Sequence, residues 1–118
     1  MSDAIDDAAF AQTLEMVGGD RTFLTDLVAT YRTDGAARIG DMRTALAAGN
    51  GADLQRAAHT LKSSSATLGA VHLADLCRDV EYRARDGELE GLSSSIEAIA
   101  TEFEAVLGAL PGRVRGGG

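Results

Sequence analysis

The sequence predicts an all-α protein: an antiparallel up-down four-helix bundle with an additional short N-terminal helix. Apolar residues recur at helical spacing along most of the 118 residues, and only 4% of the residues are aromatic. Alanine and leucine, which favour helices, dominate the chain, and glycine-containing turns divide it into one short and four long segments. Because the connections are short, consecutive helices should be antiparallel, and the long apolar stripes can be covered only by packing together.

The first predicted helix covers residues 5–17 and ends at a glycine pair. Asp20 can cap the second helix, which runs to Gly49. Gly35 and Gly40 lie inside this second helix, and each costs about 1 kcal/mol relative to alanine in a helix interior. Since the apolar periodicity stays in phase across both glycines, we predict one long helix that can bend there.

The third and fourth predicted helices are joined by a very short turn. Asn50 or Asp53 can begin the third helix, and Gly69 ends it. The fourth follows almost at once and ends at the turn Asp86–Gly87. A connection this short predicts a helical hairpin, in which residues equally distant from the turn lie at the same height.

The last predicted helix carries an apolar stripe over residues 92–110 and is ended by Pro111–Gly112. We therefore predict a single domain over residues 1–110, with the bundle at about 20–110. Residues 111–118, which close with three glycines, are predicted to form a flexible tail.

The charge of the chain limits its partners. The formal net charge is −7 and the pI is about 4.6, which argues against nucleic acid or an anionic membrane surface as a partner. No apolar run approaches the roughly 20 residues that a membrane span needs, and the acidic start lacks the basic region of a signal peptide. Cys77 is the only cysteine and is predicted to be a buried core thiol. We expect a cytoplasmic protein with a protein partner.

His59 and Lys62, the only lysine, lie three residues apart, so a helix places them on one face. At 100° per residue, His59 lies about 140° from the centre of the apolar stripe of its helix and should face water. Small side chains around an exposed imidazole allow another protein to approach closely. The predicted neighbours on this face are Ala52, Gln55, Lys62, Ser63 and Ala66.

Glu81 is predicted to reach His59 from the fourth helix. His59 lies about ten residues before the turn and Glu81 about eleven after it, so the two come nearly level at about 1.5 Å rise per residue. We expect Glu81 to accept a hydrogen bond from Nδ1–H of His59, which would leave Nε2 as the nucleophile. Arg85, one turn further on, borders the same region and is predicted to contact a partner, as are Ala52, Gln55 and Ala66.

This string of residues resembles the signature of the histidine-containing phosphotransfer (HPt) domain of bacterial multistep phosphorelays. The resemblance covers roughly residues 5–108, and the ordered string is fairly specific. In place of the glycine usual in the family at the fourth position after the histidine, this chain has a serine. The matching positions are His59, Leu61, Lys62, Ser63, Gly69–Ala70, Leu73, Leu76, Cys77 and Glu81.

The resemblance implies that His59 accepts a phosphoryl group on Nε2 from an aspartate of a receiver domain and passes it to another receiver aspartate. Lys62 would steady the phosphoryl oxygens, and the hydroxyl of Ser63 could contact them. The expected partners are receiver domains of response regulators and of hybrid histidine kinases, with Mg²⁺ bound by the receiver. We expect a monomer without a cofactor, a carrier and not an enzyme, because the chain has no carboxylate cluster or glycine-rich loop to hold Mg²⁺ or ATP.

A second class of function remains open at this stage. The chain could be an adaptor or inhibitor that binds a kinase or receiver domain without being phosphorylated. Replacing His59 by glutamine separates the two classes. A carrier then loses its phosphoryl label, which is labile in acid and stable in base, whereas an adaptor keeps its effect. The absence of a fused kinase or receiver domain suggests a stand-alone shuttle, although a piece of a longer protein would look the same.

Overall fold

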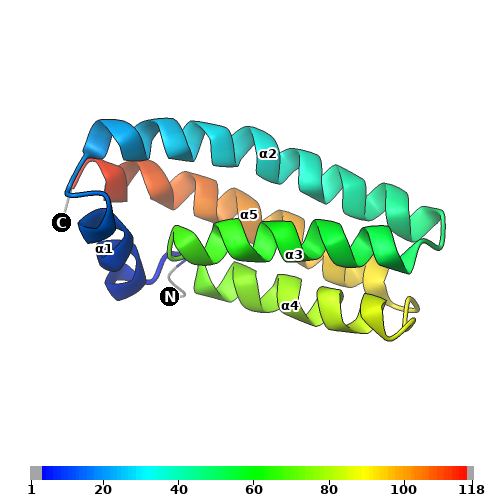
Figure 1. Cartoon of the computed structure of the whole chain (residues 1–118). Helices are drawn as coiled ribbons and strands as arrows, with labels where there is room; N and C mark the ends of the chain where they lie inside the picture. Colours follow the sequence, from blue (N-terminus) through cyan, green and yellow to red (C-terminus); the bar gives the residue numbers. More distant parts are fainter. Residues whose placement is uncertain (1–3, 117–118) are drawn as a thin grey trace.

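The computed structural model describes residues 4–116, in which helices and turns occur but no strand. The all-α prediction is confirmed. The helices are α1 (Asp7–Met16), α2 (Arg21–Ala47), α3 (Gly51–Thr67), α4 (Val71–Arg85) and α5 (Leu92–Val114) (Figure 1).

Helices α2 to α5 lie side by side, and successive helices of this set are joined at opposite ends (Figure 1). Helix α2 packs against α3 and α5, and α4 packs against the same two helices. Helix α3 and helix α4 therefore form one side of the structure, and α2 and α5 form the other. No helix in the described part of the chain is both long and apolar enough to cross a membrane.

Side-chain caps fix where the first three helices begin. Asp6 accepts a hydrogen bond from the amide of Ala9, and Asp20 accepts one from the amide of Phe23. Asn50, one of the two caps that the sequence offered for α3, accepts from the amide of Asp53. Each cap satisfies an amide that would otherwise lack a partner in the first helical turn.

Helix α2 is continuous across both of its internal glycines, as predicted. Gly35 is buried against the ring of Phe103 on α5, and a Cβ atom added there would lie 2.5 Å from two ring carbons. Gly40 has open space around it. The first glycine therefore allows α2 and α5 to approach closely, whereas the second has no packing role in the described structure.

The predicted end of the last helix at residue 110 is wrong, because α5 continues through Pro111 to Val114. The extra turn is held by packing and by charge. Val114 is buried, and its carbonyl accepts a hydrogen bond from Arg21 at 2.7 Å. Arg113 pairs with Asp7 of α1 at 2.6 Å. These contacts offset the hydrogen bond that proline cannot make, so the predicted flexible tail is wrong for residues 111–114; residues 117–118 lie outside the described part.

Among the described residues, the buried core includes Cys77, as predicted, and two polar residues, Ser65 and Glu81. The hydroxyls of Ser65 and Tyr31 are 2.7 Å apart and hydrogen-bond each other between α3 and α2. Burial raises the pKa of Tyr31 to about 12, so this hydroxyl stays protonated at neutral pH. Ser65 is thus explained by the core, which leaves Glu81 as the buried polar residue that points to a site.

The turn between α3 and α4 is fixed by the start of α1. The amide of Asp6 donates to the carbonyl of Gly69 at 2.7 Å. Gly69 has φ +82°, and a Cβ atom there would lie 3.0 Å from the backbone of Asp6 and of Phe10. Only glycine fits this backbone conformation and this close approach without strain.

Candidate functional site

His59 lies near the middle of α3, and 59% of its side chain is exposed. The buried face of α3 is formed by other residues, including Leu54 and Leu61. Because His59 lies away from this face, its ring is available to another molecule while its helix stays packed.

Glu81 of α4 holds both His59 and Lys62. Its Oε2 atom is 2.9 Å from Nδ1 of His59, and its Oε1 atom is 2.6 Å from Nζ of Lys62. The contact with His59 is the one that counting residues from the turn led us to expect. The contact with Lys62 was not predicted, and it leaves the lysine side chain 24% exposed.

The protonation of Glu81 follows from these contacts. Burial alone would raise the pKa of Glu81, but the ion pair with Lys62 and the hydrogen bond with His59 outweigh burial, and the pKa lies below its usual value. Glu81 is therefore ionised at neutral pH and can only accept hydrogen bonds. A neutral His59 must then donate from Nδ1–H, which leaves the lone pair on Nε2.

Tyr82 is a neighbour of the site that the sequence reasoning missed. It is exposed on α4, and its ring centre is 5.8 Å from Nζ of Lys62 and 4.8 Å from the guanidinium carbon of Arg85. Cations over an aromatic face are attracted by its quadrupole. The available signal was an aromatic residue directly after Glu81 and three before Arg85, which helical spacing places next to Arg85 on one face of α4.

The other predicted site residues, Ser63 for a contact with the phosphoryl group and Ala52, Gln55, Ala66 and Arg85 for contacts with a partner, are spread along α3 and α4. Ala52, Ser63 and Ala66 are exposed, and Gln55 is partly buried. Steps of three and four residues place them near His59 on α3, but none of them hydrogen-bonds to the cluster around Glu81. Arg85 is exposed and bonds to Asp86 at 3.3 Å.

The fold and the site together define a class of protein: a helical protein that presents one imidazole to solvent, with a buried carboxylate behind it and an ammonium beside it. The comparisons agree with this class. The family model of the Hpt domain matches residues 26–109, and the chain belongs to this family. It is accordingly a histidine phosphotransfer protein of phosphorelay, or two-component, signalling, a family whose members interact with receiver domains.

A solved structure supports this assignment over nearly the whole chain. The crystal structure of histidine-containing phosphotransfer protein B (HptB) from Pseudomonas aeruginosa PAO1 is similar to this chain with a TM-score of 0.86 and 30% sequence identity. The match covers 98% of this chain and 97% of HptB. A comparison with curated proteins finds no match.

Proposed function

We propose that His59 is the phosphoacceptor of this protein and that it receives the phosphoryl group from a receiver-domain aspartate. One observation carries the proposal: His59 is an exposed histidine whose Nδ1 is already bonded to a buried, ionised carboxylate at 2.9 Å. The other ring nitrogen of His59, Nε2, is then free to attack phosphorus. Glu81 acts as a positioning residue, because it fixes the ring and its tautomer without touching the phosphoryl group.

The transfer is a displacement at phosphorus. The lone pair of Nε2 forms the N–P bond, the bond between phosphorus and the aspartate oxygen breaks, and the aspartate leaves as a carboxylate. Transfer to a second receiver aspartate is the reverse reaction. Such a reaction depends on in-line placement and on neutralising the charge of the equatorial oxygens.

Lys62 supplies part of that neutralisation. Its ammonium is bound to Glu81 at 2.6 Å before the reaction, and an arriving phosphoryl group offers it oxygens that carry more negative charge. Lys62 therefore moves from the carboxylate toward the phosphoryl group, while Glu81 keeps its bond to Nδ1. The exposed hydroxyl of Ser63, one turn after His59, is placed to contact the same oxygens.

The remaining features of the proposal concern the architecture and the partner. Helices α2 to α5 form an up-down four-helix bundle with α1 as an additional helix, and the chain acts as a monomeric carrier without a cofactor. Receiver domains of response regulators and of hybrid histidine kinases dock on the face around His59 and bring the Mg²⁺. Their contacts include Ala52, Gln55, Ala66 and Arg85.

The test uses the two histidines of the chain as a matched pair. The protein is incubated with phosphoramidate, a small phosphoryl donor to imidazole, and the mass of the intact chain is measured. We expect His72→Gln to gain one phosphoryl group that is labile in acid and stable in base, and His59→Gln to gain none. Labelling of His59→Gln at the wild-type level would refute the proposal. Loss of label from labelled wild type on adding a receiver domain, with its appearance on that domain, tests the second transfer.

A further inference from the structure

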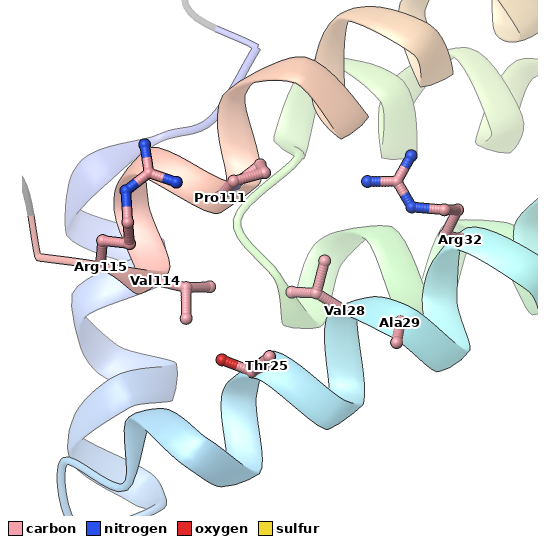
Figure 2. Close-up of a pocket in the computed structure, with 7 residues that line it drawn as sticks. All are labelled: Thr25, Val28, Ala29, Arg32, Pro111, Val114 and Arg115. Carbon is pink, nitrogen blue, oxygen red and sulfur yellow. The ribbon is translucent and has the colours of Figure 1, made fainter.

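A cleft on the other side of the molecule carries chemistry that phosphotransfer does not use. It lies between α2 and the last turn of α5 and has a volume of about 290 Å³ (Figure 2). Its residues come from α2, α5 and the residue that follows α5, whereas His59 and Glu81 belong to α3 and α4. The cleft exists because α5 continues past Pro111, so that Val114 faces Val28 across it (Figure 2).

The lining combines an apolar floor with positive charge. Val28, Ala29, Pro111 and Val114 supply apolar surface, and it is flanked by Arg32 of α2 and by Arg115, which directly follows α5 (Figure 2). The lining includes no acidic residue. A cleft of this kind, apolar with a few polar groups at its edge, is typical of small-ligand sites, which begin at roughly 300 Å³.

The two arginines of the cleft differ from the other arginines of the chain. Within residues 4–116, the structure gives the side chain of neither Arg32 nor Arg115 a hydrogen bond or an ion pair, although the chain has a net charge of −7. Arg21 bonds to backbone carbonyls. The arginines that pair with carboxylates are Arg38, Arg43, Arg56, Arg78, Arg83, Arg85 and Arg113.

We propose that this cleft binds a small amphipathic anion, a carboxylate or phosphate group attached to a short apolar chain. The anionic group bonds to the guanidinium of Arg32 or Arg115, and the apolar chain lies on Val28 and Val114. Both guanidiniums offer planar, forked donors that suit carboxylate and phosphate oxygens. The volume favours a ligand of this size over a folded protein domain, whose interface would cover about 800 Å² on each partner.

The probes for the experiment separate charge from apolar surface. Octanoate has both features, 1-octanol has only the chain, and acetate has only the anion; octyl phosphate distinguishes a phosphate head group from a carboxylate. Each is titrated into the ¹⁵N-labelled protein while backbone amide signals are recorded. We expect saturable shifts at Val28, Ala29 and Val114 with octanoate or octyl phosphate, and binding at least tenfold weaker with 1-octanol and acetate.

Substitutions then assign the binding to the cleft. Arg32→Gln and Arg115→Gln are each expected to weaken binding about threefold to tenfold because both side chains are exposed, and Arg78→Gln on α4 serves as the control that leaves it unchanged. Ala29→Phe, at an exposed position, fills the cleft and should abolish binding. Phosphorylation of His59 by phosphoramidate should be the same in all these variants.

Several results would overturn the proposal. They are the absence of saturable shifts, equal binding of octanoate and 1-octanol, equal binding of octanoate and acetate, or shifts centred on α3 and α4. Binding of an acidic peptide in the cleft without binding of either amphiphile would assign it to a protein partner instead. Because His59 chemistry is measured separately, failure of this proposal leaves the phosphoacceptor assignment unaffected.

Discussion

Replacing Glu81 by alanine should slow phosphorylation of His59 about tenfold. The substitution removes the acceptor that lies 2.9 Å from Nδ1 of His59. A hydrogen bond to a charged group contributes about 1.5–3 kcal/mol, and the 59% exposure of the histidine side chain places this one at the lower end of that range. Since about 1.4 kcal/mol corresponds to a factor of ten in rate, a loss of roughly 1.5 kcal/mol gives the tenfold effect.

Glu81→Gln separates orientation from charge. Glutamine carries no negative charge, and it replaces one of the two carboxylate oxygens by an NH₂ group, so that only one of His59 and Lys62 keeps the acceptor atom that it now contacts. We therefore expect a rate between those of wild type and Glu81→Ala. Glu104→Ala removes an exposed carboxylate on α5 and is the control, with an unchanged rate expected.

The assay measures the initial rate of phosphorylation by phosphoramidate, together with the ¹⁵N chemical shifts of the imidazole. In the wild type, the shifts should identify Nδ1 as protonated and Nε2 as free. In Glu81→Ala they should move toward a mixture of the two tautomers, a change that a purely structural role of Glu81 would not produce. A normal rate with an unchanged tautomer would refute the positioning role.

The same variant carries a prediction about pH and stability. The pKa of Glu81 lies below its usual value of 4.5, because the bonds from Lys62 and His59 outweigh the effect of burial. The ionised carboxylate therefore stabilises the fold above about pH 4.5, and this contribution is lost as the pH falls through the lower pKa of the folded state. Urea unfolding should show that the gap in unfolding free energy between wild type and Glu81→Gln narrows on acidification. A gap independent of pH would contradict this reasoning.

Two further predictions concern packing between the helices. Gly35→Ala should be less stable than Gly40→Ala by about 1–3 kcal/mol in urea unfolding. Both gain the same helix propensity, but only the first places a methyl group 2.5 Å from the ring of Phe103; equal stability would mean that α2 and α5 adjust freely. Tyr31→Phe should cost about 1–2 kcal/mol because it leaves the buried hydroxyl of Ser65 without its partner. Adding Ser65→Ala should recover part of that loss in the same measurement, and no recovery would show that the hydrogen bond is not the cause.

Much of the fold could be predicted because the ends of several helices are set by local sequence signals. Asp20 and the glycines after α2 and α3 mark helix ends through capping and left-handed backbone conformations, which depend on a few neighbouring residues. The end of α5 was missed for the opposite reason. Pro111 is a local signal to stop, whereas Val114 and Arg113 are held by α1 and α2, which are distant in the sequence.

The site likewise has one contact that could be predicted from the sequence and one that could not. The contact between His59 and Glu81 could be predicted because a hairpin of two helices with one short turn relates their heights by counting. The bond from Lys62 to Glu81 could not, because a long flexible side chain at the edge of a helix face can lie either toward solvent or toward the neighbouring helix. Periodicity gives the direction in which a side chain leaves the backbone, but not the rotamer that it then adopts.

The backbone hydrogen bond between Asp6 and Gly69 has a consequence for the substitutions that such a chain tolerates. It joins one backbone amide to one backbone carbonyl, so it is indifferent to nearly every side chain of the first helix. Substitutions on the outward surface of α1, whether natural or engineered, can therefore change the surface that α1 presents to other proteins. The α3–α4 hairpin, which aligns His59 with Glu81, is retained.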